Sequence, residues 1–238
     1  MKISVHQSAE EANRAAAELL AGWLSSAKNF MPAAGNTPLE LYRLIAEKRL
    51  AMGHLNVFIL DEYVGVPKNE PRNCANLLRR SVQAAWGIPA RQFHTISSEA
   101  HDALESVLAH ERKIEVAGGL DVLVLGLGQN GHLGFNEPGS AEDSGARVLD
   151  LEKISVEANR KWFDGKYAPN KGVTIGLKTI LAAKRILIMA YGPHKTEAVY
   201  AMVKGPRGAH CPASFLQRLP EVHVFLDQSA AAKLSHKQ

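Results

Sequence analysis

The chain has 238 residues, of which 46% are hydrophobic and 22% charged, a composition typical of a globular domain with an ample core. Its formal net charge is only +4 and its lysines and arginines are dispersed, which disfavours nucleic-acid binding and suits a small anionic substrate. There is no run of about 18 apolar residues, which excludes a transmembrane helix, and no apolar signal segment, so we expect a cytoplasmic protein without a membrane partner.

Helical and strand-like patterns alternate along the chain, which predicts an α/β fold with a mostly parallel sheet and helices on both faces. No linker rich in Ser, Gly or Pro divides the sequence, so we expect a single domain over residues 1–238. The patterns predict helices at 9–24, 39–52, near 76–85, 100–117, 154–163 and 195–203. They predict strands at 29–34, 55–60, 122–126, 173–175, 185–190 and 222–226.

The first polar turn, Gly35-Asn-Thr-Pro38, follows a strand and opens a helix. Thr37 suits the N-cap, Pro38 suits the first helical turn, and Glu40 completes a Thr-x-x-Glu capping box, which explains the segment without a ligand. Free amides on a glycine turn at a helix N-terminus also bind phosphate well. Gly35, Asn36 and Thr37 are therefore candidate phosphate-binding residues.

The run Leu60-Asp-Glu-Tyr-Val-Gly65 places two acids directly after an apolar strand. Adjacent carboxylates point in different directions, so we expect at most one to face a shared pocket. Asp61 is a candidate general base, provided that a partly dry site raises its pKa. The alternative is a solvated acidic turn.

The most informative segment is 121–139. The apolar run 122–126 has no helical period and is typical of a strand covered on both faces. At the carboxyl end of such strands, where open α/β sheets bind their ligands, His132 and Glu137 follow closely. With backbone N–H groups exposed by Gly128 and Gly131, they indicate an acid–base site on a loop.

The same glycines satisfy the dinucleotide fingerprint G-x-G-x-x-G over residues 126–131, and Asp150 lies about 20 residues on, where a ribose-binding acid belongs. That fingerprint requires a helix beginning at its third glycine. Pro138 interrupts any such helix, because it lacks an amide donor and restricts the residue before it. We therefore expect no nicotinamide cofactor.

A fourth polar strand end, Tyr191-Gly-Pro-His-Lys195, puts Lys195 in the first turn of a helix. The helix dipole is already positive there, so a lysine in that place indicates a nearby anion, with a solvated lysine as the ordinary alternative. Four sheet-edge segments thus carry polar, reactive or anion-binding groups. Cys74 and Cys211, in contrast, lack disulfide or metal-ligand spacing, and we expect two reduced structural thiols.

Residues 60–65, 126–138 and 192–195 resemble the glucosamine-6-phosphate deaminase family. That family belongs, with the 6-phosphogluconolactonases, to a superfamily of sugar-phosphate enzymes with a Rossmann-like sheet. The resemblance runs from the Gly35 turn to residues 213–217, in the same order and at similar spacing. The Asn-Glu-Pro after the histidine is its specific part, because lactonases resemble the glycine–histidine half but lack this carboxylate.

The resemblance implies a role for each candidate residue. Asp61 stands where the deaminases have the base that moves a proton between C2 and C1 of the open-chain sugar. His132 matches the histidine that opens the pyranose ring, and Glu137 the carboxylate that orients it. The positions that match groups binding the sugar phosphate are Gly35, Asn36, Thr37, Arg160 and Lys195.

Two residues depart from the usual pattern. Asn130 stands where typical glucosamine-6-phosphate deaminases have an aspartate, and an amide can orient an imidazole but cannot neutralise an imidazolium. The surrounding motif resembles the galactosamine-6-phosphate deaminase/isomerase branch, which shifts the expected substrate toward the galacto epimer. Ala34 replaces a threonine of the phosphate loop, and the loss of a hydrogen bond worth about 1–3 kcal/mol predicts weaker phosphate binding.

We therefore expect a hexosamine-6-phosphate deaminase that isomerises aldose to ketose and releases ammonia. The resemblance implies a small-molecule sugar phosphate as partner and no metal or organic cofactor. The chain lacks much sequence after the last strand, where regulated relatives extend, so we expect a monomer or small homo-oligomer rather than an allosteric hexamer. The alternatives are a 6-phosphogluconolactonase-type hydrolase using the same histidine, or a non-catalytic sugar-phosphate-binding protein.

Overall fold

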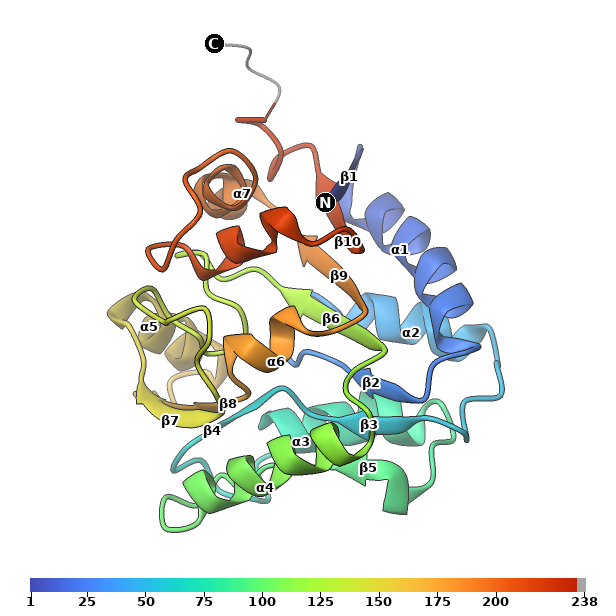
Figure 1. Cartoon of the computed structure of the whole chain (residues 1–238), viewed down its shortest axis with the longest axis vertical. Helices are drawn as coiled ribbons and strands as arrows, with labels where there is room; N and C mark the ends of the chain where they lie inside the picture. The colour runs from blue at the N-terminus through green and yellow to red at the C-terminus, as the bar shows by residue number, and fades with distance from the viewer. Residues whose placement is uncertain (235–238) are drawn as a thin grey trace.

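A computed structural model describes residues 1–234, and seven strands form its main sheet, in the order β1-β10-β9-β6-β2-β3-β5 (Figure 1). Every neighbouring pair in this sheet is parallel, which confirms the predicted α/β class. In that order the strands are β1 Lys2–His6, β10 Val222–Asp227, β9 Arg185–Ala190, β6 Val122–Gly126, β2 Asn29–Met31, β3 Asn56–Phe58 and β5 Phe93–His94.

A second sheet of three antiparallel strands was not predicted from the sequence. It consists of β4 (Asp61–Tyr63), β8 (Lys171–Thr174) and β7 (Arg147–Asp150), with β8 in the middle. The strand predicted at 55–60 is shorter than expected, because the chain leaves the main sheet after Phe58. The second sheet begins just beyond the predicted strand, at Asp61, which pairs with Thr174 of β8.

Helices flank the main sheet (Figure 1), and most of them lie close to their predicted ranges. Helix α1 begins after Ser8, whose side chain accepts a hydrogen bond from the Glu11 N–H. The α-helices are α1 Ala9–Leu24, α2 Leu39–Glu47, α3 Cys74–Leu78, α4 Ala103–Val116, α5 Lys153–Trp162, α6 Leu177–Leu181 and α7 Thr196–Val203. A π-helical turn, Arg79–Ala84, continues α3, and 3-10 turns lie at Ala90–Gln92, Pro193–Lys195 and Pro212–Arg218.

Helix α2 differs from its prediction at both ends. Its N-cap position is Pro38, and no side chain caps the helix, so the predicted Thr37 capping box is wrong. Glu40 bonds to Arg43 of the next turn instead. The helix ends at Glu47 rather than at residue 52, because Arg49 takes a left-handed conformation with φ of 51°.

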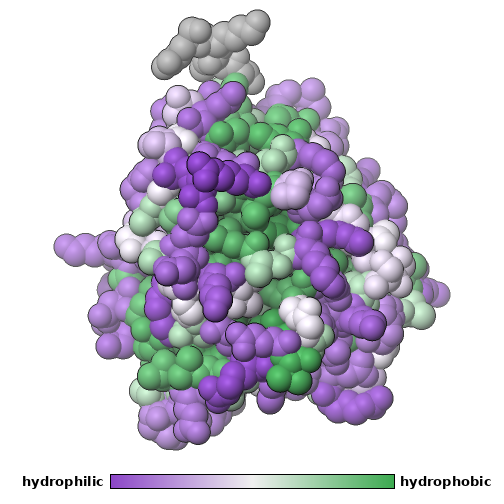
Figure 2. Space-filling model, in the orientation of Figure 1, coloured by the Kyte–Doolittle hydropathy of each residue, from purple (hydrophilic) through white to green (hydrophobic). Residues whose placement is uncertain are grey.

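The core is continuous around the main sheet. Strands β6 and β9 are buried along almost their whole length, as expected for parallel strands covered on both faces. Hydrophilic side chains cover much of the surface in Figure 2, with apolar ones gathered mainly in the centre of that view. Within residues 1–234, no helix is long and apolar enough to span a membrane.

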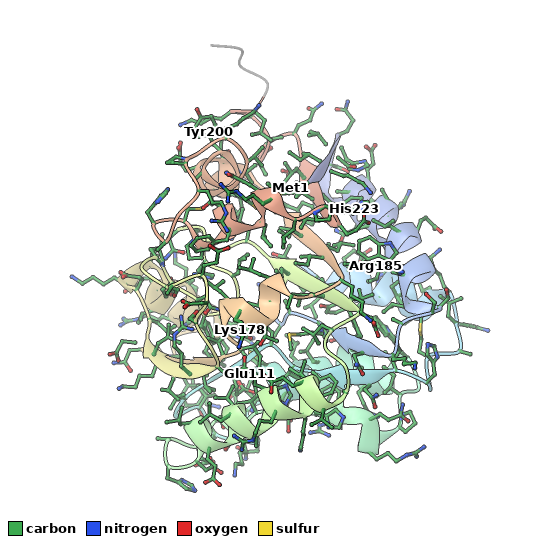
Figure 3. The ribbon with its side chains drawn as sticks, in the orientation of Figure 1. Met1, Glu111, Lys178, Arg185, Tyr200 and His223 are labelled. Carbon is green, nitrogen blue, oxygen red and sulfur yellow. The ribbon has the colours of Figure 1, made fainter. Side chains whose placement is uncertain are left out.

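Glu111 connects α4 to the neighbouring elements, and it is labelled beside Lys178 in Figure 3. Its carboxylate accepts hydrogen bonds from the Thr179 hydroxyl at 2.6 Å and from the Ala146 N–H at 3.0 Å. These bonds join α4 to α6 and to the segment leading into β7. The second sheet is thereby held beside the carboxyl edge of the main sheet.

The topology brings four strand ends to one place. Strands β9, β6, β2 and β3 are neighbours in the sheet and run parallel, so their carboxyl ends share one edge. In Figure 1 the arrowheads of β6 and β9 point toward the side where α5 and the second sheet lie. The loops after these four strands contain most of the residues that the sequence singled out.

Candidate active site

One cavity of about 200 Å³ lies at this edge of the sheet, and we call it the inner cavity. Asp61, His132 and Lys195 all line it, although they come from three segments that are distant in sequence: the start of β4, the loop after β6 and the turn before α7. Its wall is completed by Ala33 and Ala34 after β2, Gly126 at the end of β6, Leu127, Gly128, Gly134 and Phe135 of the long loop after β6, Ser155, Ala158 and Asn159 of α5, and Leu60, Tyr63 and Cys74. The predicted convergence on one cavity is therefore present.

His132 is held by its neighbours in the loop after β6. Its Nδ1 lies 3.1 Å from Glu137 Oε2, and the Asn130 amide donates to the same oxygen at 2.6 Å. The Asn130 Oδ1 in turn accepts the His132 backbone N–H at 3.3 Å. Ser155 Oγ approaches Nδ1 at 3.5 Å from α5. The other ring nitrogen is left free to act on a ligand, because Nδ1 carries these contacts.

Glu137 is buried but ionises readily. Burial opposes its charge, yet hydrogen bonds from His132, Ser155 and Asn130 outweigh this penalty and lower the pKa of the carboxyl. A carboxylate in this place favours the His132 tautomer with a proton on Nδ1, since the oxygen can only accept. The free Nε2 then accepts a proton from a ligand or returns one to it.

The glycines of this loop are explained by close approach rather than by a dinucleotide. A Cβ built on Gly128 would lie 2.3 Å from Cδ2 of the His132 ring, so only glycine leaves room for the imidazole. Gly131 has φ of 83°, a conformation that L side chains rarely adopt. No helix begins at Gly131, and the next helix of the described chain is α5, so the segment lacks the helix that the dinucleotide fingerprint requires.

Asp61 is a buried acid with a high proton affinity. Its side chain is among the buried charged groups, with the residue only 8% exposed. Burial, together with the charge of Glu62, raises the pKa of Asp61 to about 7. A raised pKa was the condition for Asp61 to be a general base. A carboxylate with a pKa near neutrality both takes up and releases a proton at physiological pH.

Glu62 does not serve the cavity in the same way. Its carboxylate accepts the backbone N–H groups of Cys74 at 3.0 Å and Ala75 at 2.9 Å, at the N-terminus of α3. It also accepts the N–H of Tyr63 at 2.9 Å. As predicted, only one of the two adjacent carboxylates, Asp61, lines the cavity.

Lys195 brings a positive charge to the inner cavity. Its Nζ donates to the Leu127 carbonyl at 2.6 Å, and no carboxylate of residues 1–234 forms an ion pair with it. Desolvation lowers the pKa of the amine. A half-buried cation without a charged partner is stabilised by a bound anion.

A second, outer cavity of about 680 Å³ adjoins the inner one at Ala158. Asn36 lines it, and the backbone N–H groups of Gly35, Asn36 and Thr37 have no hydrogen-bond acceptor within residues 1–234. Gly35 and Thr37 line neither cavity, but they flank Asn36, which lines the outer cavity. The turn therefore lies at the junction, with free amides as a phosphate site requires.

The basic residue that α5 presents to the outer cavity is Lys161, not Arg160. Arg160 is exposed and lines neither cavity. Because successive helical residues are about 100° apart, the face that carries Ala158 toward both cavities also carries Lys161. We therefore assign to Lys161 the phosphate contact that the resemblance gave to Arg160, as a proposal.

Sequence reasoning missed several residues of the inner cavity. Ser155 and Asn159 lie four residues apart on α5 and are both buried, so polar residues at helical spacing were an available signal. Tyr63 belongs to the second sheet, which was not predicted, and Cys74 was considered structural only. No pattern in the chain indicated that α3 would bring Cys74 to Asp61.

Comparison with known proteins places the chain in a family. Residues 6–224 match the sequence model of a family described as glucosamine-6-phosphate isomerases/6-phosphogluconolactonase. A glucosamine-6-phosphate deaminase of Corynebacterium kroppenstedtii is 35% identical, over 100% of this chain and 94% of the relative. A glucosamine-6-phosphate deaminase of Rhodopirellula baltica is 40% identical, over 86% of this chain and 84% of the relative.

Solved structures agree with the sequence matches. A monomeric glucosamine-6-phosphate deaminase superposes with a TM-score of 0.91 at 29% identity, covering 98% of this chain and 99% of the other. The 6-phosphogluconolactonase of Trypanosoma cruzi shares the fold, with a TM-score of 0.81 at 21% identity over 99% of this chain and 97% of the other. Fold and cavity together define an α/β protein with a cavity lined by ionisable side chains at the carboxyl edge of its sheet. The chain belongs to the family of glucosamine-6-phosphate isomerases and 6-phosphogluconolactonases.

Proposed function

We propose that the protein is a hexosamine-6-phosphate deaminase, which converts an amino-sugar 6-phosphate to the ketose 6-phosphate and ammonia. The observation that carries this proposal is that Asp61, His132 and Lys195 line one cavity. A base, a proton-transferring imidazole and a cation then meet a single small anion. The names of the relatives, at 35% and 40% identity, support the same activity.

Ring opening is the first step of the proposed reaction. His132 Nε2 takes the proton of the C1 hydroxyl and returns a proton to the ring oxygen as the C1–O5 bond breaks, which gives the open-chain aldehyde. Glu137 holds the ring by its contact with Nδ1 and stabilises the positive charge that forms when the imidazole is protonated. Asn130 orients both groups through its two hydrogen bonds.

Proton transfer between carbons follows. Asp61 removes the proton from C2, which leaves an enolamine, and returns a proton to C1 to form the imine of the ketose. Addition of water at C2 and departure of the amine then release ammonia and the ketose 6-phosphate. The pKa of about 7 suits Asp61 to both steps, because it is ionised for the first and protonated after it.

The phosphate is proposed to lie at the junction of the two cavities. There it would meet the free amides of the Gly35–Thr37 turn and the ammonium groups of Lys161 and Lys195. Ala34 supplies no hydroxyl at the cavity wall, consistent with weaker phosphate binding than in relatives that have a threonine there. We propose a monomer or small homo-oligomer acting in the cytoplasm, and the solved monomeric deaminase supports the small assembly.

The experiment is an ammonia-release assay on glucosamine 6-phosphate and galactosamine 6-phosphate. The names of the relatives favour the gluco epimer, whereas the Asn130 motif resembles the galacto branch, so both substrates are needed. Glucose 6-phosphate and galactose 6-phosphate are controls for reactions that do not require the amine. With substrate deuterated at C2 in H2O, deuterium at C1 of the product would report the transfer assigned to Asp61.

Two other outcomes would replace the proposal. Hydrolysis of 6-phosphogluconolactone without ammonia release would identify a lactonase, the function of structural neighbours that share the fold at 21% identity or less. Stabilisation by hexosamine 6-phosphates without turnover would identify a binding protein. Glu137 beside His132 favours the deaminase over both.

A further inference from the structure

Arg72 joins two segments that are 90 residues apart in the sequence. It lies in the loop between β4 and α3, and its side chain reaches the end of α5. One nitrogen, Nη1, donates to the Trp162 carbonyl at 2.7 Å and forms an ion pair with Asp164 Oδ2 at 2.6 Å. In return, the Trp162 indole Nε1 donates to the Arg72 carbonyl at 2.9 Å. These contacts hold the loop and the helix end together.

The Trp162 carbonyl is one that the helix leaves open. An α-helix ends with carbonyl groups that have no partner within it. At the end of α5, the carbonyls of residues 159–161 accept the backbone N–H groups of residues 163–165. The Trp162 carbonyl accepts no backbone N–H group of residues 1–234, and the Arg72 guanidinium takes that place. A cation is favoured there, because the C-terminal end of a helix dipole is negative.

The same contacts form part of the wall of the outer cavity. Arg72, Trp162 and Asp164 all line it. Lys161, to which we assign the phosphate contact, also lines it and directly precedes Trp162 in the chain. Arg72 is already engaged by a carboxylate and a carbonyl, so its contribution is to fix the wall of the cavity rather than to bind a phosphate.

A second ion pair joins the same two segments outside the cavity. Lys166 Nζ lies 3.0 Å from Glu70 Oε2, and neither residue lines the outer cavity. Lys166 donates to no carbonyl at the end of α5. This pair therefore distinguishes a general attachment of the two segments from the particular contact of Arg72 with the helix end.

We propose that Arg72 is a positioning residue for the phosphate contact: it caps the end of α5 from the neighbouring loop and thereby holds Lys161 facing the outer cavity. Lys161 is a long side chain on the last turn of α5, where helices fray, so its direction depends on the backbone there. Fixing the carbonyl of the next residue fixes that turn. The cap is independent of any substrate, whereas its effect on binding rests on the proposed function.

The first test observes the cap without a substrate. Hydrogen exchange of the Trp162 indole N–H can be followed by NMR, with the signal assigned by its loss in Trp162→Phe. In Arg72→Ala this N–H should exchange about tenfold faster, because the bonds that hold its segment to the loop are lost. The buried Trp86 indole, which donates to the Tyr42 carbonyl at 3.0 Å, is an internal reference. Lys166→Ala is the matched control and should change the Trp162 rate less than twofold.

The second test measures the consequence for binding in the ammonia-release assay. Arg72→Ala should raise KM for the sugar phosphate about fivefold and change kcat less than twofold, because Asp61 and His132 lie on other segments. Asp164→Asn loses the ion pair but suits the left-handed backbone at that position, where φ is 52°, and should give a smaller rise in KM. An equal rise in Arg80→Ala, which removes a charge from the same cavity, would show that charge and not the cap governs binding.

A double variant shows whether Arg72 acts through Lys161. If it does, adding Arg72→Ala to Lys161→Ala should raise KM less than twofold further, because the side chain that the cap positions is already gone. Full addition of the two effects would refute the inference. A Trp162 exchange rate that is unchanged in Arg72→Ala would also refute it, whichever reaction the enzyme catalyses.

The proposed function can fail separately. If the unmodified enzyme releases no ammonia from either epimer, that function is wrong, and the variants are compared by the Kd of glucosamine 6-phosphate, which then binds without turnover. A Kd about fivefold weaker in Arg72→Ala, with no further weakening in the double variant with Lys161→Ala, would support the cap. An unchanged Kd in Arg72→Ala would overturn its role in positioning Lys161.

Discussion

Asp61→Asn should make the folded protein more stable while removing its activity. At pH 8 the carboxylate is ionised in a buried place, where its pKa is about 7 instead of the ordinary 3.8. Each unit of pKa corresponds to about 1.4 kcal/mol, so ionisation costs the fold on the order of 4 kcal/mol relative to the unfolded chain. Asparagine has nearly the same shape and carries no charge.

The sign of the pH dependence follows from the direction of this pKa change. The folded state binds the Asp61 proton more tightly than the unfolded state. The contribution of Asp61 to the free energy of unfolding is therefore fully present below pH 3.8 and is lost as pH rises through about 7. The advantage of Asp61→Asn should therefore be near zero at pH 4 and should grow until pH 8. For a chain of this length it should raise Tm by about 10 °C at pH 8.

Thermal or urea unfolding of both proteins from pH 4 to pH 8 measures this difference, and the ammonia assay measures the loss of turnover, about 10²–10⁴-fold for a general base. Glu137→Gln is the matched control, because hydrogen bonds lower the pKa of Glu137 below 4.5 despite its burial. Its ionised form stabilises the fold above pH 4.5, so this variant should lose stability at pH 7 and lose less as pH falls. If Asp61→Asn were no more stabilised at pH 8 than at pH 4, the proton affinity assigned to Asp61 would be wrong.

Substitutions at Gly128, at Glu137 and on α5 test other parts of the site. Gly128→Ala should lower kcat about 100-fold, since the new Cβ meets the His132 ring at 2.3 Å, and a circular dichroism spectrum like that of the unmodified protein would show that the fold survives. Glu137→Gln should reduce kcat/KM at least tenfold through the loss of the charge beside His132, and unchanged turnover would remove Glu137 from the mechanism. Lys161→Ala should raise KM for the sugar phosphate about tenfold while Arg160→Ala changes it less than twofold, and the reverse order would reinstate Arg160.

The parallel sheet was predictable because the composition of its central strands indicates that they are buried. The apolar runs that became β6 and β9 have no polar alternation, which is what strands covered on both faces require. Strands β4 and β7 have no such signal, because DEY and RVLD are short and partly polar. Their pairing with β8 depends on tertiary contacts that no local pattern specifies.

The loop after β6 was predictable for a different reason. Its glycines, histidine and carboxylate lie within one short segment, so their spacing already limits how far apart the side chains can be. The Lys161 assignment was not accessible in this way, because Arg160 and Lys161 are adjacent bases and only the rotation of α5 about its axis distinguishes them. Likewise Thr37 had the chemistry of an N-cap, but the turn at Gly35 moved the start of α2 beyond it.

The site as a whole combines two carboxylates whose environments act in opposite directions. Asp61 has no backbone donor within residues 1–234, and burial raises its pKa, whereas Glu137 is held by His132, Ser155 and Asn130, and its pKa falls. When the environments of two acids move their pKa values apart, the two acids can take different roles in a reaction. One exchanges protons and the other remains charged. Asn130 in place of an aspartate preserves this division, because the Asn130 amide donates to Glu137 Oε2 at 2.6 Å, whereas a carboxylate in that place would repel Glu137 and raise its pKa.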